Sequence, residues 1–156
     1  GSSENPSGIP VRGLNTDMPI RFAPEGGAVP GDRIVGILDL KKGITIYPIQ
    51  SPDLNAFDDE PDRWIDVRWD IDAQMTQRFP ARVRLSALNE PGALAEIAET
   101  IALNDANIHS LSLSAVAPDT SSMTMDLEVW DLQHLTRTLN QLRGKACVTD
   151  VVRVNG

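Results

Sequence analysis

The sequence has few residues of the kinds that bind metals or form disulfides. It contains one cysteine, Cys147, and two histidines, His109 and His134, among 156 residues. A single cysteine excludes an internal disulfide framework and a cysteine-rich metal site. The histidines have no acidic partners at metal-binding spacing, and no Ser/His/Asp, Cys/His or phosphate-loop pattern occurs. We therefore expect no catalytic centre, metal or cofactor, and we expect Cys147 to be a small buried apolar residue.

Long apolar runs and clusters of positive charge are also absent. No run approaches the length of about 20 apolar residues that crosses a membrane, and no signal-peptide pattern is present. The net charge of −8 is spread along the chain, with 8 Lys/Arg against 13 Asp/Glu in residues 1–78 and 6 against 9 in residues 79–156. The lack of such an apolar run argues against a membrane partner, and the charge balance argues against autonomous nucleic-acid binding. A reducing cytoplasm agrees with the cysteine content.

The first half of the chain has the pattern of a small β-rich module. Residues 1–10 are rich in Gly, Ser and Pro and are predicted to be disordered. Residues 11–72 contain short strand patterns separated by turns, with Ser51 as the expected cap of a short helix over Pro52–Phe57. The expected strands are Val11–Leu14, Ile20–Ala23, Arg33–Asp39, Ile44–Ile49 and Arg63–Trp69. Residues 73–80 are expected to be a connector, anchored by Met75 and Phe79.

The second half, residues 81–156, has the order β-α-β-β-α-β of a ferredoxin-like fold. Strands are expected at 81–88, 106–115, 123–129 and 148–154, with a turn at 119–122 and a helix at 91–104. Asp131 and Gly144 are expected to begin and end a second helix, on whose polar side His134 would be exposed. The fold class is thus α+β, with both helices on one face of an antiparallel sheet and with Met123 and Met125 in the core.

The turn between the first strand and helix of this second half is the strongest candidate for a binding site. Asn89 or Glu90 is the expected N-cap, and Pro91 is expected in the first helical turn. The N–H groups of Gly92, Ala93 and Leu94 would then be unpaired at the positive end of the helix dipole, where a carboxylate binds well. The alternative is that this is only a well-made turn, which local chemistry alone favours.

A family resemblance is visible in the first half. The segment Pro30–Gly36 (PGDRIVG), followed by Lys41–Ile46 (KKGITI), resembles a small module near the C-terminus of long RelA/SpoT-type (p)ppGpp synthetase/hydrolases. That module is known as the zinc-finger or ribosome–intersubunit domain. In the family, a Cys-Cys pair precedes the Pro-Gly-Asp segment, and a His and a further Cys follow it.

This sequence lacks those metal ligands. Glu25 and Gly26 stand where the Cys-Cys pair is expected, Tyr47 stands for the His and Ser51 for the later Cys. A structural zinc site needs about four Cys or His ligands. We therefore expect no zinc and a module held together by hydrophobic packing, with a weakened case for ribosome or transfer-RNA contact.

The second half resembles the ACT family of regulatory amino-acid-binding domains, through Asn89–Leu94 (NEPGAL) and Ala106–Ile108 (ANI). The resemblance implies that two copies pair through edge strands and hold a small ligand between them. One wall of the site would comprise Asn89, Glu90, Pro91, Gly92, Ala93 and Leu94, and the other Asn107, Ile108 and His109.

The implied roles in such a site follow from the chemistry of these groups. Backbone N–H groups near Gly92 would bind the ligand carboxylate, and the acceptors of Asn89 and Asn107 would bind its ammonium group. Leu94 and Ile108 would line an apolar pocket, which favours valine, isoleucine or leucine.

Two residues of the second wall leave alternatives open. Ile108 is off the parity of Leu111 and Leu113, which indicates either a bulge or packing on the other sheet face. His109 shares that parity, and a lone histidine of this kind is more often structural than ligand-binding.

The two resemblances together imply the C-terminal regulatory region of a RelA/SpoT-type enzyme of the stringent response. The resemblance implies a homodimer that binds an amino acid and biases the catalytic domains of the same protein, so the chain is not itself expected to be an enzyme. The alternative is an interaction module without a ligand, docking on the catalytic domains or the ribosome. An ACT domain of a biosynthetic enzyme is a third hypothesis, against which the Pro30–Gly36 module argues.

Overall fold

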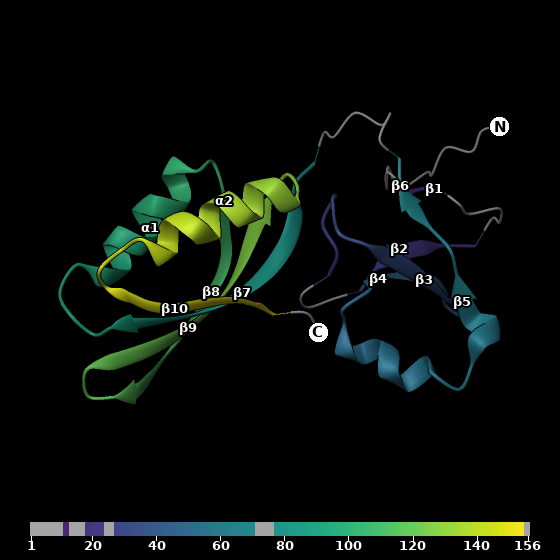
Figure 1. Cartoon of the computed structure of the whole chain (residues 1–156), viewed down its shortest axis with the longest axis horizontal. Helices are drawn as coiled ribbons and strands as arrows, with labels where there is room; N and C mark the ends of the chain where they lie inside the picture. Colours follow the sequence, from purple (N-terminus) through teal and green to yellow (C-terminus); the bar gives the residue numbers. More distant parts are fainter. Residues whose placement is uncertain (1–10, 13–17, 24–26, 71–76, 155–156) are drawn as a thin grey trace.

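A computed structural model describes residues 11–12, 18–23, 27–70 and 77–154 of the chain. The predicted disordered segment 1–10, the Glu25-Gly26 pair and Met75 lie outside these residues. The described parts form two lobes, a β-rich lobe from the first half and an α+β lobe from the second (Figure 1). The C-terminal end of the last strand lies between the two lobes.

The first lobe is built on a four-stranded mixed sheet. Its strand order is β2-β4-β3-β5, formed by β2 (Ile20–Phe22), β3 (Ile34–Asp39), β4 (Gly43–Pro48) and β5 (Trp64–Ile65). Strands β3 and β4 form the predicted antiparallel hairpin, and β2 runs parallel to β4. A separate two-stranded sheet joins β1 (Val11–Arg12) to β6 (Arg68–Trp69).

The expectation of one continuous strand over Arg63–Trp69 is wrong. The 3-10 helix Pro61–Arg63 ends at Arg63, and the rest divides into β5, which pairs with β3, and β6, which pairs with β1. Val67, between the two strands, is buried in the core of the lobe. The alternating pattern was real, but the two halves of the segment find different partner strands.

Hydrophobic packing holds the first lobe together on both faces of its sheet. One cluster joins Ala28, Ile34, Ile44, Ile46 and Val67, and the other joins Val35, Ile37 and Leu54. Two of the positions where the family has zinc ligands make other contacts in this chain. The ring of Tyr47 packs against the ring of Phe57, and Ser51 Oγ accepts a hydrogen bond from the N–H of Asp53. That bond makes Ser51 the predicted cap of Pro52–Phe57, which is a 3-10 helix. Across the described ranges, no three His, Cys, Asp or Glu side chains are grouped to hold a metal.

The second lobe has the predicted β-α-β-β-α-β order, which confirms the α+β class. Its elements are β7 (Phe79–Leu88), α1 (Ala93–Leu103), β8 (Asn107–Ala117), β9 (Thr120–Val129), α2 (Leu132–Arg143) and β10 (Val148–Val154). The sheet has the order β10-β7-β9-β8, with every neighbouring pair antiparallel.

Several boundaries in this lobe differ from the sequence prediction. Strand β7 begins at Phe79, because Phe79 already pairs with Val129 of β9. Helix α1 begins at Ala93, and the β8–β9 turn consists of Pro118 and Asp119 only. Helix ends and turns are the least certain parts of a sequence pattern, since they depend on one or two residues.

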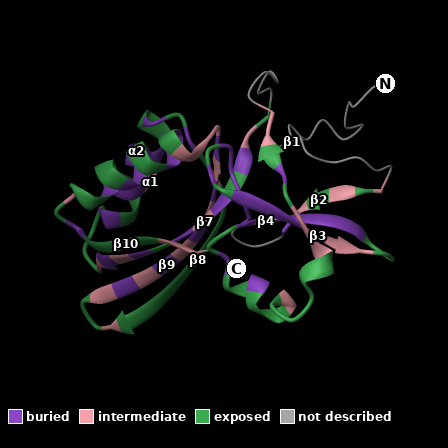
Figure 2. Cartoon of the chain, turned by 45° about the vertical axis from the view of Figure 1, so that its right-hand side comes forward, coloured by how far each residue is buried: buried purple, intermediate pink, exposed green. Residues whose placement is uncertain are grey.

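Alternate residues of β7 and β9 form the core beneath the two helices, as the buried stripes in Figure 2 show. Met123, Met125 and Cys147 are buried there, which confirms the three predictions. The opposite face of the sheet is polar, with Arg82 paired to Asp126 at 2.8 Å. Within the described part of the chain, no helix is long and apolar enough to cross a membrane.

The expectation that His134 is exposed is wrong. Its side chain is buried, Nδ1 accepts a hydrogen bond from the N–H of Trp130 at 3.0 Å, and Nε2 lies 2.5 Å from the carbonyl oxygen of Asn104. Asn104 is the C-cap of α1. The end of α1 therefore covers this side of α2, which the pattern of α2 alone could not indicate.

Candidate functional site

The predicted strand-to-helix turn presents an open backbone at the start of α1. Gly92 is the N-cap residue, with φ 84° and ψ −8°, so the predicted N-caps Asn89 and Glu90 are wrong and Pro91 precedes the helix. A Cβ atom built on Gly92 would have no atom within 4 Å. The left-handed φ favours glycine, and the absence of a side chain leaves the end of the helix accessible from outside.

The N–H groups at this helix end are partly occupied. Ala93 N–H donates to the carbonyl oxygen of Glu90 at 3.2 Å, so the expectation that it is unpaired is wrong. The bond from Glu96 N–H to Gly92 C=O, at 3.0 Å, closes the first helical turn. The N–H groups of Leu94 and Ala95 therefore lie at the helix end, where a helix has no acceptor of its own. Ala95 was not among the predicted site residues, because the sequence placed the helix start two residues too early.

Asn89 ties this turn to the neighbouring hairpin. Its backbone N–H donates to Asp119 C=O at 2.8 Å, and its side-chain Nδ2 donates to Pro118 C=O at 3.3 Å. The side-chain oxygen of Asn89 is left to act as an acceptor, which is the role that the sequence predicts for it. Leu94 lies in the first turn of α1, and its 42% exposure allows it to contact an apolar ligand.

The second predicted wall lies at the beginning of β8. Asn107 Nδ2 donates to Glu128 Oε1 at 2.7 Å, and His109 Nδ1 lies 3.8 Å from Glu128 Oε2. The β8–β9 register shifts between Ile108 and Ser110, which confirms the bulge alternative, and Ile108 packs against the core of the lobe.

Glu128 was missed in the sequence analysis, because the alternation of β9 indicates its sheet face but its place opposite Asn107 depends on strand register. The polar alternation of β9 places Glu128 on the open sheet face, and an antiparallel β8–β9 hairpin brings it level with Asn107.

The structure does not bring the two walls together within one chain. Asn107 pairs across the sheet with Glu128, which in turn pairs with Pro80 near the start of β7. Asn89 directly follows Leu88, at the other end of β7. The eight steps from Pro80 to Leu88 span about 26 Å at roughly 3.3 Å per residue. The two walls therefore lie at opposite ends of the same sheet.

Strand β8 forms one edge of that sheet and presents apolar side chains. Leu111 and Leu113 are 41% and 54% exposed. Their cross-strand partners are the buried residues Met125 and Met123, so both leucines lie on the helix side of the sheet. A long edge strand with exposed leucines is a typical surface for pairing with another strand.

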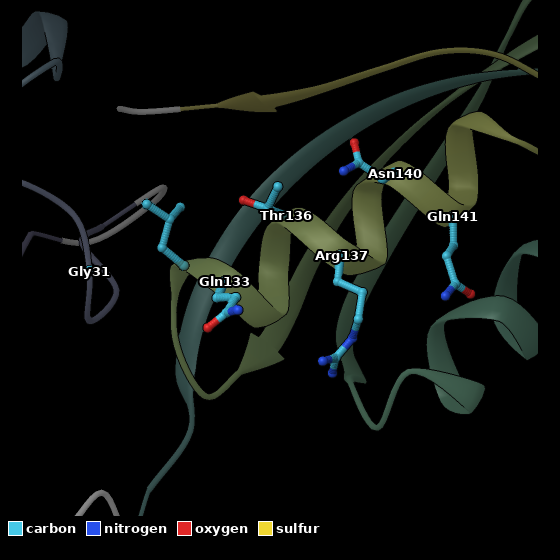
Figure 3. A pocket seen from close by; sticks show the side chains of 7 residues that line it. Gly31, Gln133, Thr136, Arg137, Asn140 and Gln141 are labelled. Carbon is cyan, nitrogen blue, oxygen red and sulfur yellow. The ribbon is translucent and has the colours of Figure 1, made fainter.

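A hollow of about 610 Å³ lies elsewhere, along the outer side of α2 (Figure 3). It is lined by Gly31, Leu132, Gln133, Thr136, Arg137, Asn140 and Gln141. None of the predicted site residues lines this hollow. It carries no charge-bearing group other than Arg137, and the candidate ligand site is therefore the pair of walls described above.

The two lobes match two known families in the order that the sequence resemblances predict. Residues 9–70 match the RelA/SpoT RIS domain, and residues 75–153 match the ACT domain. The chain belongs to the RelA/SpoT family. The first lobe is its RIS domain and the second its ACT domain.

Curated proteins similar to this chain are named as GTP pyrophosphokinases or as a (p)ppGpp synthase/hydrolase. It is 64% identical over 148 residues to the GTP pyrophosphokinase rsh of Brucella abortus (strain 2308), covering 95% of this chain and 20% of that protein. It is 31% identical to a GTP pyrophosphokinase of Myxococcus xanthus, covering 90% and 18%, and 26% identical to the bifunctional (p)ppGpp synthase/hydrolase SpoT of Escherichia coli (strain K12), covering 94% and 20%. The chain thus spans about a fifth of the length of these curated relatives.

The chain is also similar to a solved structure. The crystal structure of the ACT domain from the GTP pyrophosphokinase of Chlorobium tepidum matches with a TM-score of 0.45 and 25% identity. That match covers 49% of this chain and 99% of the solved one.

Proposed function

We propose that this chain is the amino-acid-sensing region of a (p)ppGpp synthetase/hydrolase, and that it binds one aliphatic amino acid in each of two sites between paired ACT domains. The observation that carries the proposal is the position of the two walls at opposite ends of a sheet whose edge strand β8 is unpaired on its outer side in the described structure. Neither wall is complete alone, and a second copy supplies the missing one.

Antiparallel pairing of two β8 strands would join the walls. A two-fold axis through Ser112 sets Asn107 of one copy opposite Ala117 of the second. Ala117 adjoins Pro118, which holds the side chain of Asn89 at the start of the first wall. Such a pairing is isologous, so it makes the same site twice.

The exposed leucines of β8 support this arrangement. Leu111 and Leu113 lie on the helix side of the edge strand, where a second copy would cover them. Burial of the exposed half of each side chain contributes about 1 kcal/mol, in addition to the backbone hydrogen bonds between the strands. Two copies bury four such leucines, about 4 kcal/mol in all, which offsets part of the free energy that association costs.

The chemistry of the joined walls matches an aliphatic amino acid. The N–H groups of Gly92, Leu94 and Ala95 would bind its carboxylate. Its ammonium group would lie near the acceptors of Asn89 and of the second copy's Glu128 and Asn107, and Leu94 and Ile108 would contact its side chain. Valine, isoleucine and leucine meet these requirements better than a charged amino acid.

Regulation would follow if the ligand prefers one arrangement of the domains. The bound amino acid would stabilise the ACT dimer, and that shift in population would bias the hydrolase and synthetase domains of the same protein. The names of the relatives, all (p)ppGpp enzymes, support this assignment of the parent activity.

The test is a calorimetric titration of the chain with each of the standard amino acids. We expect binding of branched-chain amino acids only, together with chemical-shift changes in residues 89–95. Gly92→Val should abolish the binding, because the new side chain covers the open backbone. Gly144→Val is the control for adding a side chain at a helix end, since Gly144 is the C-cap of α2, has an ordinary φ of −78° and is not a residue of either wall. Absence of binding at millimolar concentration would refute amino-acid sensing.

The competing function is docking on the catalytic domains or the ribosome without a ligand. The RIS match supports it, whereas the net charge of −8 argues against contact with ribosomal RNA. Gly92→Val distinguishes the two functions, because it should leave a docking surface intact. Leu113→Lys should prevent ACT pairing in the sensing hypothesis and should reduce ligand binding with it.

A further inference from the structure

The Pro-Gly-Asp turn of the RIS domain enters the ACT domain. The side chain of Val29 has no exposed surface and belongs to the ACT core rather than to the RIS core. Pro30 C=O accepts a hydrogen bond from the N–H of Leu132 at 2.7 Å. Leu132 is the first residue of α2, whose N–H has no acceptor within its own helix, so the RIS domain caps an ACT helix.

Close approach of the two domains at this turn depends on Gly31. Its φ is +105°, and a Cβ atom at this position would lie 2.9 Å from Leu132 Cβ. Figure 3 shows the Gly31 turn beside the first turn of α2. Both the backbone conformation and the contact with α2 therefore exclude a larger residue without displacement of one domain.

Asp32 and Arg153 then join the domains through a buried bidentate ion pair. Arg153 Nη1 and Nη2 donate to Asp32 Oδ1 and Oδ2, each at 2.7 Å. The side chain of Asp32 is 2% exposed and that of Arg153 is 12% exposed. Asp32 Oδ2 also accepts from the N–H of Val29 at 2.8 Å, and Arg153 Nη2 donates to Gly27 C=O at 3.2 Å. Asp32 belongs to the RIS domain and Arg153 to β10 of the ACT domain.

An aromatic cluster extends the contact on the same side. The rings of Phe22 and Trp69, from the RIS domain, are stacked at 5.5 Å. Phe79, the first residue of the ACT sheet, meets both of them edge-on at 5.6 and 5.7 Å. Trp69 Nε1 donates to the backbone oxygen of Asp32 at 2.9 Å, which connects the cluster to the ion pair.

We propose that the Pro30–Asp32 turn and Arg153 form a latch that holds the RIS and ACT domains as one rigid unit, so that a displacement of α2 or β10 in the ACT domain moves the RIS domain with it. Domains within one chain are expected to move relative to one another unless their interface is large and apolar. Here the interface also contains a buried charge pair, and removal of either partner leaves the other charge buried without compensation. The latch is independent of the proposed ligand, since its residues touch neither wall.

The amide of Leu132 is a specific probe of this latch, because its acceptor is in the other domain. Hydrogen exchange measured by NMR on the whole 156-residue chain should show Leu132 protected in the wild type. Arg153→Met should accelerate its exchange by at least about tenfold, because the turn then leaves the helix end. Amides in the middle of the ACT sheet, such as those of Leu85 and Met125, should change much less.

Arg143→Met is the matched control. Arg143 also contacts β10, with Nη2 donating to Val151 C=O at 3.1 Å, but both residues are in the ACT domain. This variant should leave the exchange of Leu132 unchanged. Equal exchange of Leu132 in the Arg143 and Arg153 variants would overturn the latch.

Asp32→Asn keeps the test decisive if Arg153→Met unfolds, and a double variant extends the test if Arg153→Met folds. Asp32→Asn keeps the shape of the side chain and should also accelerate Leu132 exchange by about tenfold. The double variant Asp32→Asn, Arg153→Met should exchange no faster than the faster single variant, because both changes remove the same pair. Fully additive effects, or a wild-type RIS domain that unfolds in urea separately from the ACT domain, would contradict a rigid unit.

Discussion

His134 provides a sharp test of how the ACT helices are held together. His134→Leu removes the acceptor of the Trp130 N–H and the donor to the Asn104 carbonyl while keeping an apolar side chain of similar size. Each buried group left without a partner costs about 1–3 kcal/mol. The two groups together cost about 2–6 kcal/mol and burial of the leucine returns roughly 1 kcal/mol, so the net loss of unfolding free energy should be about 1–5 kcal/mol.

The assay is urea unfolding followed by circular dichroism. With an m-value of about 2 kcal/mol/M, the expected loss lowers the midpoint by about 0.5–2.5 M. His109→Leu is the natural control, because the side chain of the other histidine is 68% exposed, and its change should stay within about 0.5 kcal/mol. Equal midpoints for the two variants would refute a structural role for the His134 bonds.

The same bonds determine the tautomer of His134. The Trp130 N–H donates to Nδ1, so the ring hydrogen must be on Nε2, where it is donated to Asn104 C=O. Nitrogen chemical shifts of the imidazole ring should therefore show the Nε2–H tautomer. Detection of the Nδ1–H form would mean that the contact between α1 and α2 is different.

Three further predictions concern charge, reactivity and backbone strain. The hydrogen bond from Arg82 lowers the pKa of Asp126, so this pair stabilises the fold above the carboxyl pKa of the unfolded chain, and the stabilisation is lost as the pH falls through the lower folded pKa. The difference in urea midpoint between wild type and Asp126→Asn should therefore shrink between pH 5 and pH 2.5. A difference that stays constant over this range would contradict the prediction. Burial, followed by the nearby Glu96, raises the pKa of the Cys147 thiol, so Ellman's reagent should modify it at least about tenfold more slowly in the folded chain at pH 8 than in urea, whereas equal rates would show an exposed thiolate. Gly31→Ala should destabilise the fold by about 1–2 kcal/mol more than Gly92→Ala. Both glycines have positive φ, but only at Gly31 would the new Cβ atom clash with the Cβ atom of Leu132. Equal shifts in the melting temperature would argue against this contact.

The elements whose pattern depends on near neighbours could be predicted from the sequence. Apolar and polar residues alternate through β7 and β9, which fixed the buried face of the ACT sheet. Asp131 and Gly144 mark the two ends of α2 as predicted, since capping depends on groups within three or four residues. The motifs at Pro30–Gly36 and Asn89–Leu94 were sufficient to indicate the family.

The candidate site was predicted only in part for the same reason. The turn at Gly92 and the bulge before Ser110 are local features, and both were recognisable. The bond that occupies the Ala93 N–H depends on where the helix begins, and the role of Glu128 depends on strand register. Register is a property of two strands, so no single stretch of sequence specifies it.

Tertiary structure decided what distant residues do to one another. The segment Arg63–Trp69 divides because its two halves meet β3 and β1, and His134 is buried because the end of α1 lies against α2. Asp32 and Arg153 are 121 positions apart in the chain, and nothing in the neighbourhood of either predicts that they form a buried pair. The sequence by itself therefore determined the two domains and the open helix end, because those depend on short-range pattern and conformation. The separation of the two walls and the joining of the RIS and ACT domains depend on which surfaces meet when the whole chain packs.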